Sequence, residues 1–166
     1  MSNALISIKP ENVKMILCGE KSIEIRNRPV NLAPGTRLWI YSTLPSGCLE
    51  AVATVKLIKF DSPSTIWKDY CNLIGISHKR FRSYVNGSTG ISAIFLQHVR
   101  KLKPSLTLHD LRSEVQDFHP PQFLKRMRNV NPILHLIKMK RVKLTSLHSF
   151  SVTDKRNEVN GSGLSN

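Results

Sequence analysis

The chain of 166 residues has few cysteines, and they form no recognisable pattern. Cys18, Cys48 and Cys71 are odd in number and widely spaced, whereas zinc sites and disulfide frameworks need paired or closely spaced cysteines. Cys18 falls within a predicted helix, where we expect it to pack as a small core residue. Unpaired thiols are typical of a reducing compartment. We therefore predict a cytoplasmic protein, with a nucleoid- or nucleus-associated one as the alternative.

Long apolar runs are also missing, so we expect no membrane-spanning segment. The N-terminus lacks a charged region followed by an apolar stretch, so we expect no secretory signal. None of the six histidines pairs with a carboxylate at the spacing of a metal-binding helix. We predict neither a metal site nor a cofactor.

Acidic residues are scarce: 11 Asp and Glu face 25 Lys and Arg, which gives a net charge of +14. Such an excess predicts an anionic partner, most commonly nucleic acid, although a solvated basic surface with no ligand is the alternative. The apolar pattern fades from residue 141, where Ser, Thr, Asn, Gly and charge dominate. We predict one domain over residues 1–140 and a flexible basic tail over residues 141–166. The basic run at 138–143 is either solvated or a nonspecific phosphate-binding extension.

Short strand patterns alternate irregularly with short helix patterns. Helix starts are marked by Pro10 at a first turn, by Ser62 before Pro63, and by Ser77. Strands are expected over 4–9, 22–26, 37–41, 50–60 and 91–99, and helices after Pro10, Ser62, Ser77 and Thr107 and over Gln122–Met127. The type of the element over 133–139 stays open. The fold class predicted is α+β, with a small, mostly antiparallel barrel or curled sheet decorated by short helices.

The segment from Gly19 to Arg26, GEKSIEIR, is the most informative part of the chain. Side chains alternate along a strand, so Glu24 and Arg26 share one face while Ile23 and Ile25 share the other. Lys21 precedes the strand and can reach over the charged face. A carboxylate between two cations at the edge of a small sheet suits a polar, anionic ligand.

The sequence resembles the activating-signal-cointegrator homology (ASCH) domain, a branch of the PUA-like superfamily. The resemblance covers about residues 4–127 and is strongest in the G-x-K-x-x-E-x-R element, which follows a strand–Pro–helix unit and precedes a Pro-Gly turn and a strand. The matching segments are LISIKP at 5–10, GEKSIEIR at 19–26, PGTRLWIYS at 34–42 with Pro45, YVNG at 84–87 with Ala93-Ile94, and PPQ at 120–122. The resemblance implies a small β-barrel decorated by helices, with a cleft lined by the charged strand.

Relatives in this family are thought to bind RNA or modified nucleosides, or to act as transcription coregulators. A minority branch hydrolyses acylated cytidine with a Lys and a Thr of the same element and a distant Glu. Here Lys21 matches, but Glu24 replaces the Thr, which argues against that amidohydrolase activity. Some relatives cut RNA. The resemblance leaves open whether this chain is an enzyme.

The candidate nucleic-acid-binding residues come from these matched segments. Lys21 and Arg26 would hold phosphate or a base edge, and Glu24 would accept a hydrogen bond from a base amino group. The alternative for these three is a buried ion pair that fixes the strand. The full candidate set is Lys9, Lys21, Glu24, Arg26, Tyr41, Ser42, Thr43, Tyr84 and Gln122.

Aromatic residues near these positions have two interpretations. Tyr41, with Ser42 and Thr43, would stack on and hydrogen-bond an unstacked base, or would pack at the rim of the barrel. Trp39 is either an exposed stacking platform or part of the core. Bases and aromatics also mix over 79–84, which is the composition of a single-strand contact surface or of an ordinary amphipathic helix.

We therefore predict a module that binds RNA or a modified nucleoside, and recognition rather than turnover as its mechanism. The first alternative is a hydrolase that uses Lys21 and Glu24 on acylated cytidine or on RNA. The second is a protein-interaction module whose cleft binds a protein partner.

Overall fold

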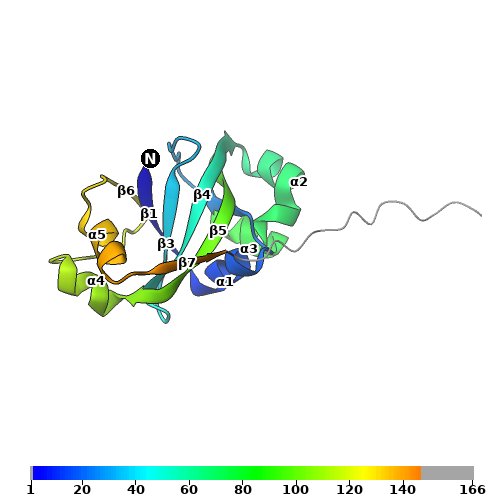
Figure 1. Cartoon of the computed structure of the whole chain (residues 1–166). Helices are drawn as coiled ribbons and strands as arrows, with labels where there is room; N and C mark the ends of the chain where they lie inside the picture. The colour runs from blue at the N-terminus through cyan, green and yellow to red at the C-terminus, as the bar shows by residue number, and fades with distance from the viewer. Residues whose placement is uncertain (1, 147–166) are drawn as a thin grey trace, which may run out of the picture.

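The computed structural model describes residues 2–146, and it shows a curled, seven-stranded sheet with five short helices around it (Figure 1). The α+β class predicted from the sequence is confirmed. The elements in chain order are β1 Asn3–Ile8, α1 Pro10–Cys18, β2 Ile23–Arg26, β3 Arg37–Ser42, β4 Cys48–Asp61, α2 Pro63–Ile74, α3 His78–Val85, β5 Ile91–Thr107, α4 Leu108–Glu114, β6 Leu124–Met127, α5 Pro132–Met139 and β7 Lys143–Ser146.

The sheet has the strand order β2-β5-β4-β3-β1-β6, and β7 pairs with the second half of β5. The β1–β3 pair is parallel and the other pairs are antiparallel, as predicted. The long strands β4 and β5 bend because their pairing contains several register shifts, and bulges increase local twist. The sheet therefore curls into a half-barrel in which β2 and β1 are separated by three strands in the hydrogen-bonded order.

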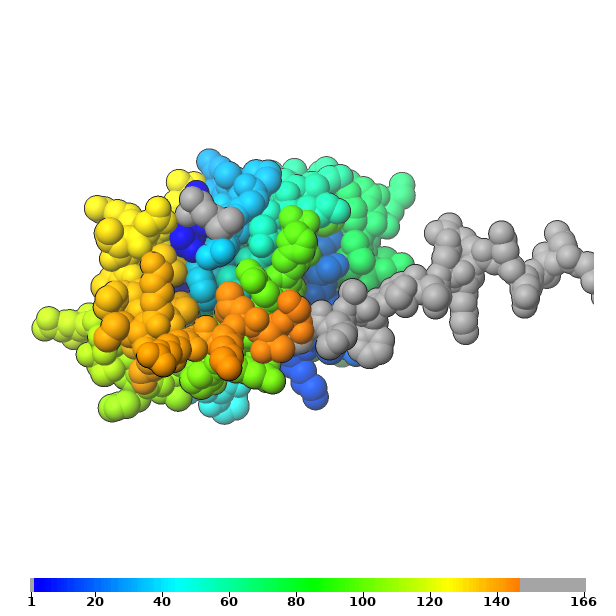
Figure 2. Space-filling model, viewed as in Figure 1, coloured from blue at the N-terminus to red at the C-terminus, as the bar shows by residue number. Residues whose placement is uncertain are grey.

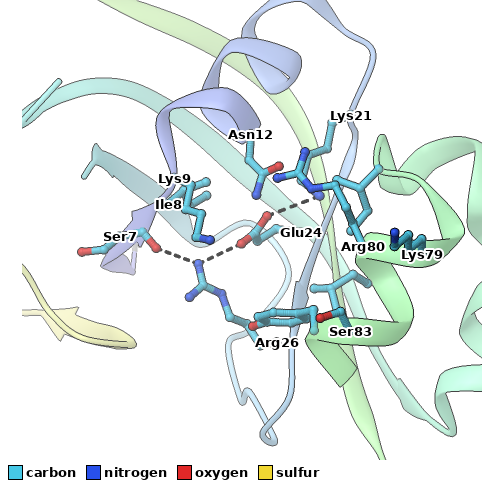
Figure 3. Close-up of a pocket in the computed structure, with 13 residues that line it drawn as sticks. Ser7, Ile8, Lys9, Asn12, Lys21, Glu24, Arg26, Lys79, Arg80 and Ser83 are labelled. Carbon is cyan, nitrogen blue, oxygen red and sulfur yellow. Dashed lines mark hydrogen bonds and ion pairs between the residues drawn. The ribbon is translucent and has the colours of Figure 1, made fainter. Parts of the chain in front are cut away.

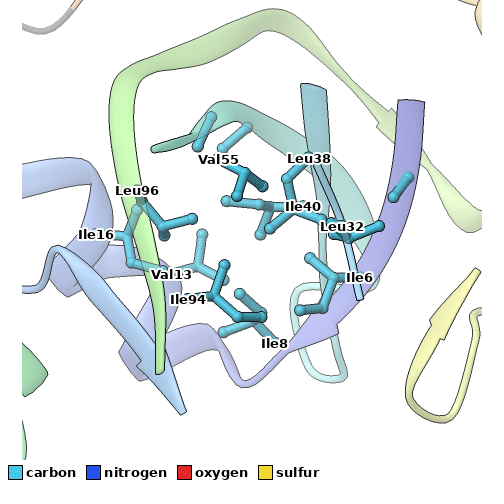
Figure 4. Packing of buried hydrophobic residues seen from close by; sticks show 13 residues of the cluster. Ile6, Ile8, Val13, Ile16, Leu32, Leu38, Ile40, Val55, Ile94 and Leu96 are labelled. Carbon is cyan, nitrogen blue, oxygen red and sulfur yellow. The ribbon is translucent and has the colours of Figure 1, made fainter. Parts of the chain in front are cut away.

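Three apolar clusters within residues 2–146 hold the fold together. The first fills the inside of the curl, where Val13 and Ile16 of α1 pack on strand residues such as Ile40 and Ile94 (Figure 4). The second lies under α4 and α5 and contains Trp39, which is 3 % exposed; Trp39 is a core residue. The third lies under α2 and α3. Figure 2 shows the end of α5 and β7, in orange, running across the face of the molecule turned to the viewer.

The helix starts follow the predicted caps. Ser62 Oγ accepts a hydrogen bond from the Thr65 amide at 3.2 Å, and Ser77 Oγ accepts one from the Arg80 amide at 3.3 Å. Thr107 begins a reciprocal capping box in α4. Capped first turns fix where α2 and α3 begin, and these two helices flank the charged strand β2.

Some expectations from the sequence were wrong. Residues Leu124–Met127 form strand β6 and not a helix, because they pair with the free edge of β1. Cys18 is exposed and not a core residue: at 100° per residue it points well away from the buried Val13–Ile16 stripe. The sheet also extends past the predicted domain end at residue 140, since residues 143–146 form β7; residues 147–166 of the predicted tail lie outside the described residues.

Candidate functional site

A cavity of about 560 Å³ opens where the end of β1, the start of α1, β2 and α3 meet (Figure 3). We call it the β2 cavity. Its floor carries Lys21, Glu24 and Arg26, the cation–anion–cation trio predicted from the sequence. The further residues that line it are Ser7, Ile8, Lys9, Asn12, Ile25, Ile76, Lys79, Arg80, Ser83 and Tyr84.

The trio is almost completely buried: Lys21 is 2 % exposed, Glu24 5 % and Arg26 7 %. Glu24 Oε1 accepts a hydrogen bond from Arg26 Nη2 at 2.8 Å, and Glu24 Oε2 lies 3.5 Å from Lys21 Nζ. Buried charges need such partners, because an isolated ion in a protein interior is very costly. The alternative foreseen from the sequence, a buried ion pair that fixes the strand, therefore describes part of the arrangement.

The two cations also bind backbone carbonyls. Lys21 Nζ donates to the carbonyl oxygen of Ile74 at 2.8 Å, and Arg26 Nη2 donates to that of Ser7 at 2.8 Å. Burial lowers the pKa of Lys21, although Glu24 beside it acts in the opposite direction, and Arg26 and Arg80 lower it further. Lys21 therefore loses its proton more readily than an exposed lysine does.

The trio does not satisfy all of the polar atoms around it. Within the described residues, three buried polar atoms of the β2 cavity have no hydrogen-bond partner: Ser7 Oγ, Asn12 Oδ1 and Arg26 Nε. Buried polar atoms are nearly always paired in native proteins. Three of them on residues that line one cavity leave hydrogen-bonding capacity beside the trio that the described residues do not use.

The rim of the cavity is cationic. Lys9 at the end of β1 and Lys79 on α3 are exposed, and Arg80 Nη2 pairs with Glu11 Oε1 at 3.0 Å. Tyr84 is 44 % exposed, and burial raises the pKa of its hydroxyl. Of the residues that line the cavity, five are cationic and one, Glu24, is acidic. This excess favours an anionic ligand.

The predicted residues divide into two groups. Lys9, Lys21, Glu24, Arg26 and Tyr84 line the β2 cavity together, although they come from three separate segments of the chain.

The others do not line it. Tyr41 and Ser42 are buried at the end of β3, where Tyr41 packs on Phe118 with ring centroids 6.3 Å apart. Thr43 donates its amide to the carbonyl of Ile8, and Gln122 is exposed. The barrel-rim interpretation therefore describes Tyr41 better than base stacking does.

Sequence reasoning missed several residues near the trio. Ser7, Asn12 and Ser83 line the cavity, and the Arg26 guanidinium carbon lies 5.7 Å from the ring centroid of Phe123. Asn12 had a detectable signal, since it follows Lys9-Pro10 in the first turn of α1. Phe123 had none, because the loop before β6 reaches β2 only through the tertiary fold.

Among the described residues, no cluster of three His, Cys, Asp or Glu side chains is placed to hold a metal ion. Over the same residues, no helix is both long and apolar enough to span a membrane.

No family model matches the chain. A curated ASCH domain-containing ribonuclease from Zymomonas mobilis is 31 % identical over 125 residues, which are 75 % of this chain and 84 % of that protein. This chain belongs to the ASCH domain family. Crystal structures of an ASCH protein from the same organism superpose with a TM-score of 0.77. One of these structures is 28 % identical in sequence, and the match covers 82 % of this chain and 94 % of that chain. The structure of a tyrosine-to-phenylalanine variant is 27 % identical, and the match covers 84 % of this chain and 99 % of that chain.

The shared fold is the ASCH/PUA-like α+β fold expected from the sequence, and its curled sheet forms a half-barrel. A hypothetical protein from Leishmania major, 14 % identical with a TM-score of 0.50, has a similar fold.

Proposed function

We propose that this ASCH domain binds single-stranded RNA and holds one nucleotide in the β2 cavity. The observation that carries the proposal is the floor of that cavity, where a buried, charged trio lies beside three unpartnered polar atoms and beneath a cationic rim. The Zymomonas relative is named a ribonuclease, which supports RNA as the ligand class. Binding to RNA also agrees with the net charge of +14. The predicted cytoplasmic location goes with this proposal.

Each part of the cavity has a role in this proposal. Lys9 and Lys79 on the rim attract phosphates, which positions the strand but reads no sequence. Glu24 retains lone pairs beyond its contacts with Lys21 and Arg26, so it can accept from an amino group such as N4 of cytosine. The exposed ring of Tyr84 offers a stacking face to the same base.

Binding is tested with a fluorescein-labelled, eight-nucleotide RNA and anisotropy at several salt concentrations. Lys9→Ala and Lys79→Ala should each flatten the plot of log affinity against log salt by about 0.7, the contribution of one phosphate contact on a single strand. Lys56→Ala is the matched control, because Lys56 is exposed on β4 and does not line the cavity. Glu24→Gln should reduce a preference for cytidine over uridine oligomers by about tenfold.

Absence of binding by the wild-type protein at low salt would overturn the proposal and leave the protein-interaction alternative. The slopes of log affinity against log salt could instead be equal for all three lysine variants, with an unchanged base preference in Glu24→Gln. That result would show nonspecific attraction of RNA to a basic surface and no specific nucleotide site.

Cleavage of the bound RNA is a second candidate, favoured by the lowered pKa of Lys21 and by the name of the relative. In this step neutral Lys21 takes the proton of a ribose 2′-hydroxyl, and the 2′-oxygen attacks the adjacent phosphorus. The bond from phosphorus to the 5′-oxygen breaks, that oxygen takes a proton from the Tyr84 hydroxyl, and a 2′,3′-cyclic phosphate remains. Arg26 and Lys9 balance the negative charge that develops on the phosphate oxygens.

Chromatography of RNA incubated with the protein separates binding from cleavage. Cleavage predicts a cyclic phosphate end, resistance of an RNA carrying a single 2′-deoxy sugar at the cut, and loss of turnover in Lys21→Met with Lys56→Ala still active. Binding of intact RNA with no product after long incubation would exclude this second candidate and leave the first standing.

A further inference from the structure

A second cavity, of about 460 Å³, lies between α2 and α3. We call it the Trp67 pocket. Trp67 of α2 and His78 of α3 form its aromatic wall, and their ring centroids lie 4.8 Å apart with 33° between the ring planes. The ring of Phe81, which is 2 % exposed, packs on Trp67 from the core side at a centroid distance of 4.8 Å. The buried Phe81 ring thus supports Trp67, and the rings of Trp67 and His78 line the pocket.

The rest of the lining suits a nucleotide. Lys68 and Arg82 bring two positive charges, and Asn86 and Ser88 bring side chains that can donate and accept hydrogen bonds. Of the residues that line this pocket, none is acidic. Aromatic rings next to cations are the composition by which proteins bind single strands, since any base can stack on a ring while a cation holds its phosphate.

Helix α3 separates the two cavities and contributes to both. Lys79, Arg80, Ser83 and Tyr84 line the β2 cavity. His78, Phe81, Arg82 and Val85 line the Trp67 pocket. An α-helix is about 10–12 Å across with its side chains. A strand of a few nucleotides is long enough to cross it, and the basic residues that α3 contributes to the two cavities, Lys79, Arg80 and Arg82, are exposed.

We propose that the Trp67 pocket is a second nucleobase-stacking subsite, which receives a base of the same RNA strand that enters the β2 cavity. This inference rests on the proposed function. It assigns Trp67 and His78 to base stacking and Lys68 and Arg82 to the phosphates beside that base.

Oligonucleotide length gives the test. Anisotropy titrations compare labelled single-stranded RNAs of two and eight nucleotides with wild type, Trp67→Leu and the exposed double variant Lys68→Ala/Arg82→Ala, after circular dichroism confirms that each is folded. Both variants should bind the eight-nucleotide RNA about tenfold more weakly and the dinucleotide within twofold of wild type. Tyr70→Leu is the matched control: Tyr70 is a partly buried aromatic of the same helix, but its ring packs on Phe95 and does not line the pocket.

Tryptophan emission gives an independent measurement. The sequence has two tryptophans, and Trp39 is buried in a different cluster. Stacking of a base on Trp67 should quench the emission of wild-type protein when unlabelled eight-nucleotide RNA is added, and Trp67→Phe should lose that response.

The outcomes separate the two proposals. If the eight-nucleotide RNA binds and responds to Lys9→Ala and Lys79→Ala, but the Trp67 and Lys68/Arg82 variants match wild type, the subsite is overturned and the proposed function stands. If no RNA binds to the wild type, the proposed function fails and this inference fails with it. Equal losses in Tyr70→Leu and Trp67→Leu, with Lys68→Ala/Arg82→Ala unchanged, would also overturn the subsite.

Discussion

Arg26 Nη2 donates to Glu24 Oε1 on its own strand and to the carbonyl of Ser7 on β1, each at 2.8 Å. β2 and β1 are not neighbours in the sheet, because β5, β4 and β3 lie between them in the strand order. Arg26 therefore links β2, at one end of the strand order, to β1, which lies one strand in from the other end. Arg26 has two roles: it holds Glu24 in the candidate site, and it connects two strands that are not neighbours in the sheet.

Glu24→Ala should strongly destabilise the protein, because it leaves Lys21 and Arg26 buried without a counter-charge. Breaking a buried ion pair on one side costs about 3–5 kcal/mol. Urea denaturation measures this as a lower midpoint at an unchanged slope.

Glu11→Ala is the control for that loss. Glu11 also accepts from an arginine, Arg80, but both side chains of that pair are about half exposed. Exposed pairs contribute about 0–1 kcal/mol. Equal losses in Glu11→Ala and Glu24→Ala would show that the trio is solvated in solution and not buried.

Gly75→Ala should disturb the site through Lys21. Gly75 ends α2 with φ = 71°, and a Cβ atom there would lie 2.8 Å from Lys21 Cβ. Gly19 has a similar φ of 84° with nothing within 4 Å of its added Cβ. Both substitutions should cost about 1–2 kcal/mol for the left-handed backbone.

The difference between these two glycine variants isolates the contact with Lys21. Gly75→Ala should lose additional stability in thermal unfolding and should bind RNA more weakly, whereas Gly19→Ala should keep wild-type affinity. A Gly75→Ala protein with the stability and affinity of Gly19→Ala would contradict the contact.

The cap of α3 should support both cavities. Ser77→Ala removes the acceptor for the Arg80 amide and should lower the free energy of unfolding by about 1 kcal/mol, while Ser77→Asp should retain most of it. Hydrogen exchange of the first-turn amides of α3 measures the effect locally. Ser62→Ala, which uncaps α2, is the comparison. Unchanged exchange in α3 for Ser77→Ala would show that packing of Phe81 alone fixes the helix.

The sequence was sufficient to predict most of the elements because local signals agreed with the fold. Pro10, Ser62 and Ser77 mark helix starts, and Gly19 takes the left-handed conformation that ends α1. The strand β6 had no such signal: Leu124–Met127 became a strand because the edge of β1 was free to pair. Tertiary context overrides weak local preference in segments this short.

The site was predictable in part for the same reason. Alternation placed Glu24 and Arg26 together, and Lys21 was near them in sequence. The sequence left their burial as one of two alternatives, because it depends on contacts made only in the tertiary fold, such as the hydrogen bond from Lys21 to the Ile74 carbonyl. The contributions of Ser7 and Asn12 likewise depend on how β1 and α1 lie against β2, which the tertiary fold decides.

Stability should also fall at low pH through Asp110. Hydrogen bonds from Lys140 and Thr107 lower the pKa of Asp110 from 3.8 to about 2. Between pH 4 and 2 the unfolded chain therefore binds more protons than the folded one, so the stabilisation is complete above pH 4 and is lost as the pH falls toward 2. The pair is partly exposed, so the contribution is about 0.5–1 kcal/mol at low salt.

Urea titrations of wild type and Asp110→Asn at pH 6, 4, 3 and 2 measure this contribution. The two proteins should differ at pH 6 and 4 and converge by pH 2, since asparagine can still accept from the Thr107 amide but carries no charge. Lys140→Ala should narrow the pH range over which the stabilisation by Asp110 is lost, because the hydrogen bond from Lys140 is the largest cause of the lowered pKa of Asp110. A difference that stays constant from pH 6 to pH 2 would mean that Asp110 acts only as a helix cap, and that its ion pair with Lys140 adds nothing to folding.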